Sequence, residues 1–315
     1  RKHIPMVYYH VWDNYPYPRF NKKFYDSNDF IATISKVTSK AVQTVSPDVK
    51  EKYIPHAVNT DIFRKYNRNK EESEQIKQMK ITQDSLKNKF VFFWNNRNAR
   101  RKQPGTLLFW FKEFLDKVGH DKATLLMHTD LQDPHGQPLD YLMESLGLNN
   151  GQVMFSTEKL PPEELAKMYN ICDCTINIAD AEGFGLATLE SLACEVPIIV
   201  NMTGGLQEQV TNGEDWFGVG IHPSSRSVIG SQSVPYIYED RISKDHFIKA
   251  LEHMINLEPS DLKKLGQKGR QHVLDNYGFD KFNETWVKEM INIHETCGSW
   301  ETRKNYSSWE CKEIL

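Results

Sequence analysis

The sequence predicts an α/β protein built on doubly wound parallel sheets. Short apolar runs of strand length recur along the 315 residues, and after residue 90 most of them are separated by longer stretches with helical periodicity. Parallel strands need such crossovers, and alternating strands and helices are typical of open sheets with helices on both faces. The length is enough for two modest domains. No apolar run approaches the roughly 18 residues that a membrane-spanning helix needs.

Each predicted element follows from local composition. Apolar, strand-like runs lie at 6–9, 30–34, 90–94, 123–127, 153–155, 174–178, 198–200 and 219–221. Helical periodicity lies at 106–118, 139–146, 163–169, 186–195, 245–255, 261–276 and 282–294. Pro162 suits the first position of its helix. The polar, charged residues 64–89 indicate a linker or an exposed helix.

Charge and cysteine content narrow the class of protein. The net charge is −3, with basic side chains in excess in the first third and acidic ones afterwards. The basic third fits two descriptions, a surface that faces phosphates or anionic lipid, or an ordinary solvated surface. Nucleic acid is not an expected partner. The five cysteines are an odd number, which favours free thiols in a reducing cytoplasm, and Cys172 and Cys174 should point to opposite faces of a strand.

Two carboxylates flank a glycine turn between a strand and a helix. Glu182 precedes Gly183-Phe184-Gly185, and Glu190 follows in the helix that begins near Leu186. Such a turn exposes backbone N–H groups, and the helix N-terminus adds partial positive charge, so phosphate is a fitting ligand. Glu190 lies about one turn into the helix and leans back toward that end, where its carboxylate suits the hydroxyls of a sugar or ribose. The alternative is a solvated glutamate after an ordinary glycine turn.

The same turn is a poor match to dinucleotide binding. Gly183-Phe184-Gly185 supplies a G-x-G pattern, but Thr188 stands where the third glycine belongs. About 20 residues further on, after the strand at 198–200, the acid that would hold an NAD ribose is missing. A nicotinamide enzyme is therefore not predicted.

A second phosphate signal follows the strand at 90–94. Four cations come directly after it, namely Arg97, Arg100, Arg101 and Lys102. Ligands gather at the carboxyl ends of parallel strands, arginine offers phosphate a bidentate fork, and lysine offers a compact charge. A solvated basic loop is the alternative. The glycine turn follows another strand of the same predicted sheet, which strengthens the phosphate interpretation.

Together these residues resemble a known family. The chain is similar to the retaining glycosyltransferases of family 4, which have the GT-B fold of two Rossmann-like domains. The resemblance spans most of residues 30–290. It rests on Ile54-Pro55-His56-Ala57-Val58-Asn59, Arg97 with Lys102, the helix-like stretch 165–173, the pair Glu182 and Glu190, and Thr203-Gly204-Gly205-Leu206-Gln207-Glu208.

The resemblance implies transfer of a sugar from a nucleotide-diphosphate donor to an unknown acceptor, such as a glycan, a lipid or another hydroxyl. Arg97 and Lys102 would stabilise the leaving diphosphate, and Glu190 would hold the ribose hydroxyls. Glu182 would hold hydroxyls of the transferred sugar, beside the backbone amides of Gly183, Phe184, Gly185 and Leu186. His10 resembles a family histidine that faces the donor sugar, with a structural role as its alternative.

The resemblance also implies that part of the N-terminal domain, which carries the acceptor site in this family, is missing. The Ile-Pro-His segment closes that domain deep inside family members, whereas here it occurs by residue 54. Residues 1–67 are then the remainder of the domain, 68–89 a linker, and 90–277 a complete nucleotide-sugar-binding domain. Residues 278–315 are expected to form a helix and tail that pack back toward the first domain. The expected location is the cytoplasm or the cytoplasmic face of a membrane.

Three other functions stay open. Paired carboxylates also serve glycosidases, although a hydrolase has no diphosphate for the cations to hold. A truncated chain could bind the donor without transferring its sugar, and a sugar-nucleotide epimerase shares the GT-B fold. No Asp-x-Asp occurs in the sequence. Arginine and lysine are therefore expected to stabilise the diphosphate in place of a metal, and no metal or cofactor is predicted.

Overall fold

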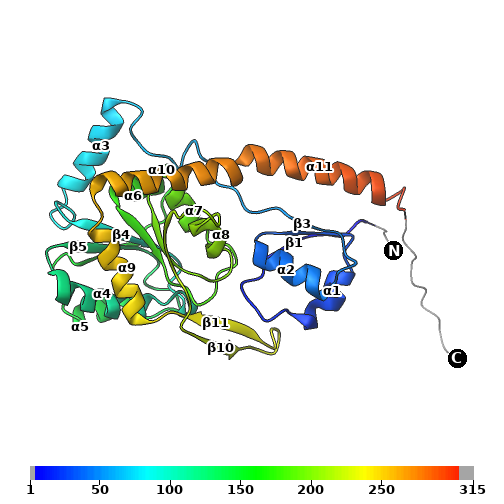
Figure 1. Ribbon diagram of the computed structural model, residues 1–315, viewed down its shortest axis with the longest axis horizontal. Coiled ribbons are helices and arrows are strands. Elements are labelled where there is room, and N and C mark those ends of the chain that lie inside the picture. The colour runs from blue at the N-terminus through cyan, green and yellow to red at the C-terminus, as the bar shows by residue number, and fades with distance from the viewer. Residues whose placement is uncertain (1–3, 305–315) are drawn as a thin grey trace.

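Two parallel sheets organise the computed structural model, which describes residues 4–304. Residues 1–3 and 305–315, including Cys311 and the end of the expected tail, lie outside the described residues. The first sheet has the order β1-β2-β3 and the second the order β6-β5-β4-β7-β8-β9, and neighbouring strands in both run parallel. Figure 1 shows the two sheets with their helices as separate bodies joined along one side by the long helices α10 and α11.

The first domain is small. Its strands are β1 (Val7–His10), β2 (Phe30–Thr33) and β3 (Glu51–Tyr53), and its helices are η1 (Arg19–Asn21), α1 (Lys22–Asp26) and α2 (Lys36–Val45). Ser35 caps α2 by accepting a hydrogen bond from the Thr38 N–H at 3.1 Å. The inner face of α2 packs against the sheet, where Val42 and Ile31 share one core with Tyr25.

The second domain has helices on both faces of its sheet. Along β4 the side chains alternate, so that Val91 and Phe93 enter one core while Phe92 and Trp94 enter the other. One core packs against α3, α6, α7, α8 and α10, and the other against α4, α5 and α9. This burial on both faces explains why the strands are continuous apolar runs in the sequence.

The bounds of the elements in the second domain are as follows. Its strands are β4 (Phe90–Asn95), β5 (Ala123–His128), β6 (Val153–Ser156), β7 (Cys174–Asn177), β8 (Ile198–Asn201) and β9 (Gly218–Ile221). Its helices are α3 (Lys70–Ile81), η2 (Arg100–Lys102), α4 (Pro104–Val118), α5 (Leu139–Ser145), α6 (Pro162–Ile171), α7 (Leu186–Ala193), α8 (Leu206–Val210), α9 (Lys244–Ile255) and α10 (Pro259–Asn276).

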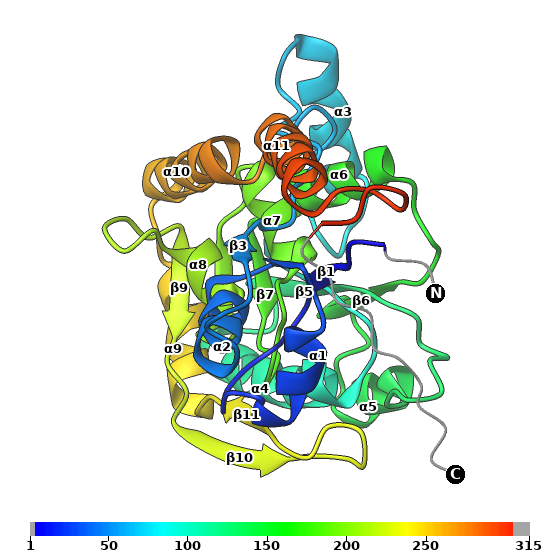
Figure 2. The ribbon, with the colours of Figure 1, turned by 90° about the vertical axis from the view of Figure 1, so that its right-hand side faces the viewer.

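Two segments of the later chain reach back to the first domain. Helix α11 (Phe279–Cys297) places Ile293 in the core formed by Phe30, Ala32 and Ile54, and Figure 2 shows it nearly end-on, above the first sheet. The hairpin of β10 (Ser225–Ile229) and β11 (Ile237–Arg241) stands outside both sheets. Its Tyr238 N–H donates to the carbonyl of Tyr15 at 2.6 Å.

The predicted fold class is confirmed, and each of the eight expected strands overlaps a strand of the structure. The residues 64–89 contain α3, a largely exposed helix with no fully buried residue, whose partly buried Ile76 and Met79 pack against the core of the second domain. Elements that the sequence did not predict are α1, α2, α8, β3, β10 and β11. Strand β3 was missed because Glu51-Lys52-Tyr53 is not an apolar run, and β10 because most of its side chains are exposed.

Candidate active site

The order of the larger sheet reverses between β4 and β7. In open parallel sheets a crevice forms at such a switch point, outside the carboxyl ends of the strands. Lys102 lies in η2, shortly after β4, and Glu182 follows β7. The fold therefore brings the two predicted phosphate signals together at the place where an α/β sheet binds its ligands.

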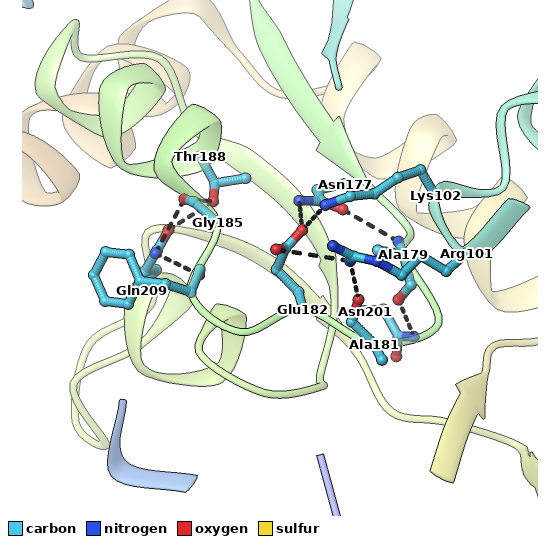
Figure 3. Close-up of polar contacts among 11 residues, drawn as sticks. Arg101, Lys102, Asn177, Ala179, Ala181, Glu182, Gly185, Thr188, Asn201 and Gln209 are labelled. Atoms are coloured by element: carbon cyan, nitrogen blue, oxygen red, sulfur yellow. Dashed lines mark hydrogen bonds and ion pairs between the residues drawn. The ribbon is translucent and has the colours of Figure 1, made fainter. Parts of the chain in front are cut away.

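Lys102 and Glu182 form a buried ion pair at this switch point, as Figure 3 shows. Lys102 is 8% exposed and Glu182 is 7% exposed. Asn177 donates to Glu182 Oε2 at 3.5 Å, and Arg101 Nη1 lies 3.9 Å from Glu182 Oε1. Burial lowers the pKa of Lys102, and the charge of Glu182 opposes that shift. An anionic ligand that displaced the Glu182 carboxylate from part of its contact with Lys102 would face two cations already in place, Lys102 and Arg101.

Side chains of α7 and α8 form hydrogen bonds that fix the glycine turn. Gly185 has a φ of 94°, which suits glycine, and it is the N-cap of α7 with no side-chain cap on the helix. Gln209 donates to the carbonyls of Phe184 at 2.8 Å and Gly185 at 3.1 Å, and it accepts from Thr188 at 2.6 Å. These bonds engage the carbonyls of the turn and leave the first N–H groups of α7 available to a ligand.

Glycines also let the two domains approach at the turn. A Cβ on Gly183 would lie 2.8 Å from Asp13 Oδ1, and a Cβ on Gly204 would overlap the backbone carbonyl of Glu182. The neighbouring Gly205 donates its N–H to that same carbonyl at 3.0 Å. The loop after β8 therefore fixes the backbone of Glu182 in a way that no larger residue at position 204 permits.

Two residues of the turn point away from each other. Phe184 is buried, and its ring lies 5.2 Å from that of His56 and 5.8 Å from that of Tyr277, so its side chain belongs to the contact between the domains. Leu186 is 46% exposed at the start of α7. Phe184 could therefore contact a ligand only through its backbone.

Glu190 lies on α7 and is linked to the end of β4. Tyr169 donates its hydroxyl to Glu190 Oε2 at 2.9 Å, and Asn95 donates to that hydroxyl at 2.9 Å. Burial raises the pKa of Glu190 to about 7. The carboxylate is thus oriented by a buried tyrosine and keeps one oxygen for a ligand.

Arg97 and His10 are not brought to the Glu182 carboxylate. Arg97 makes a two-point contact with Asp133 through its Nε and Nη2 atoms. His10 is buried at the end of β1, with its Nε2 atom 2.7 Å from the Tyr25 hydroxyl. Burial lowers the pKa of His10 to about 4, so the ring is neutral. Its Nδ1 atom has no hydrogen-bond partner within residues 4–304.

Two residues at the site were not singled out from the sequence. Arg101 donates to the Ala181 carbonyl at 2.7 Å and faces Glu182, although the sequence showed it only as one member of a basic run. Asp13 comes from the first domain, after β1. Burial raises the pKa of Asp13, while the nearby charges of Arg101 and Lys102 lower it and that of Glu182 raises it. No local pattern around Asp13 predicts its position, because the approach of the two domains creates it.

The assembled site holds two cations, three carboxylates and the N-terminus of α7 at a domain boundary. It can bind a diphosphate through Arg101, Lys102 and backbone amides, and it can bind hydroxyl groups through Glu182, Glu190 and Asp13. Within residues 4–304, no group of three or more His, Cys, Asp and Glu side chains is placed to hold a metal ion.

A sequence profile of the family described as glycosyl transferases group 1 matches residues 75–272, which is more than half of the chain. The chain belongs to this family. Residues 90–95, Lys102, Glu182, Gly185 and Glu190 all fall within the matched region. The predicted resemblance to GT-B glycosyltransferases is thereby confirmed.

Named relatives of this chain match it over only part of their own length. The D-inositol 3-phosphate glycosyltransferase of Corynebacterium jeikeium (strain K411) is 32% identical over 132 residues, covering 41% of this chain and 31% of the relative. The alpha-1,3/1,6-mannosyltransferase ALG2 of Dictyostelium discoideum is 26% identical over 281 residues, covering 84% of this chain and 60% of the relative. The chain therefore spans 60% or less of the length of these relatives.

Solved structures share the fold of this chain. Sucrose-phosphate synthase from Thermosynechococcus elongatus has a TM-score of 0.68 at 18% identity, covering 87% of this chain and 61% of that one. Anabaena Alr3699/HepE in complex with UDP and glucose has a TM-score of 0.68 at 13% identity, covering 91% and 71%. The arrangement of two Rossmann-like domains is thus of the GT-B type.

Proposed function

We propose that this group 1 glycosyltransferase moves a sugar from a nucleotide-diphosphate donor to a hydroxyl acceptor, with retention of configuration at the anomeric carbon. The observation that carries the proposal is the buried Lys102–Glu182 pair at the switch point, beside the uncapped N-terminus of α7. A glycosidase has no use for cations at this place. A donor has both a diphosphate for the cations and hydroxyls for the carboxylates.

The reaction breaks the bond between the anomeric carbon and a diphosphate oxygen. Negative charge develops on that oxygen, and preorganised cations and N–H groups stabilise such charge without a reorganisation of solvent. In the proposal Lys102 and Arg101 serve this purpose, with the amides of Gly185 and Leu186. Arg97 joins them when it leaves Asp133, because it is exposed and lies on the same loop.

The carboxylates divide the hydroxyl groups of the donor between them. Glu190 binds the ribose, because it sits one turn into α7 and is oriented by Tyr169. Glu182 and Asp13 bind the transferred sugar, because Asp13 reaches Gly183, the residue after Glu182, at the boundary of the two domains, and the charge of Glu182 acts on Asp13. His10 precedes Asp13 by three positions in the sequence. From the family resemblance we propose that it faces the donor sugar.

The names of similar proteins indicate which donors to test first. The HepE complex contains UDP and glucose, and the ALG2 relative is a mannosyltransferase, so UDP-glucose and GDP-mannose are the first donors to test.

No helix within residues 4–304 is long and apolar enough to cross a bilayer. We propose that the protein acts in the cytoplasm or at the cytoplasmic face of a membrane. At a membrane, the basic first third of the chain would lie nearest to the anionic lipid.

The experiment is to supply UDP-, GDP- and ADP-sugars, with and without a hydroxyl acceptor, and to follow nucleoside diphosphate and sugar products by mass spectrometry. Diphosphate release that depends on an acceptor supports transfer. Conversion of the donor sugar without an acceptor indicates an epimerase, and binding without conversion indicates a donor-binding module. Transfer should continue in EDTA, and a loss that manganese restores would refute the predicted independence of metal.

A further inference from the structure

A cavity of about 440 Å³ opens where the two domains are joined. Its wall contains both connections between the domains, residues 54–57 after β3 and residues 277–278 between α10 and α11. The two connections lie side by side, because the Val58 N–H donates to the Tyr277 carbonyl at 2.9 Å. None of the lining residues belongs to the Lys102–Glu182 site.

The lining combines cationic and aromatic side chains. Lys36, Lys52 and Lys281 line the cavity, whereas no aspartate or glutamate does. Tyr53 and Tyr277 add flat apolar surface. Three ammonium groups with no carboxylate among the lining residues are unusual in a chain whose net charge is −3.

Two of these lysines form no ion pair within residues 4–304. The carboxylate of Glu208 lies behind the lining, where it accepts hydrogen bonds from the Tyr53 hydroxyl at 2.6 Å and the Lys36 backbone N–H at 2.8 Å. Burial raises the pKa of Glu208, and the charge of Lys36 opposes that shift. Lys52 is paired with Glu289 on α11. Among residues 4–304, no carboxylate forms an ion pair with Lys36 or Lys281, and the Lys281 ammonium donates only to the Asp275 carbonyl, at 2.9 Å. Asp280 lies in the first turn of α11 but outside the lining. The unpaired charge of the cavity therefore comes from two domains, with Lys36 on α2 and Lys281 on α11.

The two histidines in the lining add no charge at neutral pH. The His272 ring accepts a hydrogen bond from Asn276 at its Nδ1 atom, and its Nε2 atom lies 2.9 Å from the Glu208 carbonyl. His56 is bonded through its Nδ1 atom to the Tyr9 hydroxyl at 2.8 Å. Burial lowers the pKa of both rings. An anion in the cavity is therefore attracted by the lysines rather than by the histidines.

We propose that this cavity binds a small phosphorylated organic molecule. Its phosphate would lie between Lys36 and Lys281, and its organic part would pack on Tyr53 and Tyr277. Such a ligand would touch both connections between the domains. It would also touch His56 and Tyr277, on which Phe184 of the glycine turn packs. The binding stands independently of the proposed function, whereas any effect on sugar transfer rests on it.

The test uses phenyl phosphate as the probe and the full chain as the protein. Isothermal calorimetry should show phenyl phosphate binding more tightly than inorganic phosphate or phenol alone, because only the whole probe uses both lysines and tyrosines. The double variant Lys36→Glu, Lys281→Glu should bind roughly tenfold more weakly or worse, since each lost charge-assisted contact has a large effect. Both lysines are exposed, so the variant should keep the wild-type melting temperature.

Two controls make the result decisive. The variant Lys40→Glu, Lys288→Glu makes the same charge change on α2 and α11, at exposed positions outside the lining, and should bind phenyl phosphate like the wild type. Lys102→Ala should also leave this binding unchanged. The proposal is overturned if phenyl phosphate does not bind, if the two double variants weaken it equally, or if Lys102→Ala abolishes it, which would assign the probe to the Glu182 site.

Discussion

Lys102 and Arg101 face Glu182, whereas Arg97, on the same loop, faces Asp133 on the outside of the second domain. The sequence indicated phosphate binding by this whole run of cations, but it could not say which members point inward. The 3-10 turn η2 decides this, because it directs Lys102 into the protein and leaves Arg97 on the preceding loop. The contribution of each cation to diphosphate binding therefore has to be measured by substituting the side chains one at a time.

The Arg97–Asp133 contact competes with any role of Arg97 at the diphosphate. If Arg97 binds the donor, Asp133→Asn should release it and tighten nucleoside diphosphate binding, while Arg97→Ala should weaken it roughly tenfold. Calorimetric titration of both variants measures this. Equal affinity in the wild type and both variants would remove Arg97 from the site and leave Arg101 and Lys102 to hold the diphosphate.

Glu190 gives the site a pH dependence. Burial raises its pKa to about 7, above the ordinary value of 4.5, so the folded protein favours the neutral acid until the pH passes about 7. Only the ionised form is a strong acceptor for the ribose hydroxyls. Nucleoside diphosphate affinity should therefore rise between pH 6 and 8. Glu190→Gln should be weaker and should lack this rise; a rise of equal size in that variant would assign it to another group, such as the phosphate itself.

At the scale of elements, the loop between β8 and α8 supports the turn between β7 and α7. Gly204, with a φ of 48°, and Gly213, with a φ of 101°, both have left-handed backbones. A Cβ on Gly204 would overlap the Glu182 carbonyl, whereas one on Gly213 would meet nothing within 4 Å. The two glycines therefore form a matched pair that separates backbone strain from steric contact.

Gly213→Ala should cost only the backbone strain of about 1–2 kcal/mol. Gly204→Ala should cost clearly more in the free energy of unfolding, and it should also weaken nucleoside diphosphate binding, because it displaces Glu182. Urea unfolding and calorimetry on both variants provide the comparison. Equal losses of stability, with donor affinity unchanged in both, would show that this loop does not support the turn.

The strands that the sequence predicted and those it missed differ in apolar content. The central strands of the larger sheet, β4, β5, β7 and β8, are apolar runs because they are buried on both faces, as Phe92 and Phe93 illustrate. Strand β3 and the β10–β11 hairpin carry polar side chains whose partners are distant in the chain. Asp240, for example, accepts from Asn14 at 2.7 Å across 226 positions, a contact that no local pattern encodes. The same reason explains why Lys102 and Glu182 could be predicted from strand ends, while Asp13 could not.

For the whole molecule, the return of α11 to the first domain is the main apolar tie. Trp286 packs edge-on against Tyr9 of β1 with 5.4 Å between the rings. Trp286→Ala should cost about 2–4 kcal/mol of stability and should increase hydrogen exchange in β1–β3 more than in β4–β9. Val287→Ala, at a position that is 59% exposed on the same helix, should change little. Uniform exchange across both sheets would show that the domains unfold as one unit.

The central claim is that a nucleotide-sugar donor binds at the Lys102–Glu182 pair, and one measurement tests it most directly. UDP and GDP are titrated calorimetrically into the wild type and into Lys102→Met, with Lys117→Met on α4 as an exposed-lysine control and melting curves to verify folding. Arg101→Met replaces Lys102→Met if the latter does not fold. We predict that Lys102→Met lowers the affinity for the preferred diphosphate roughly tenfold to a hundredfold, while the control binds like the wild type. Equal affinity in all three proteins would contradict the account.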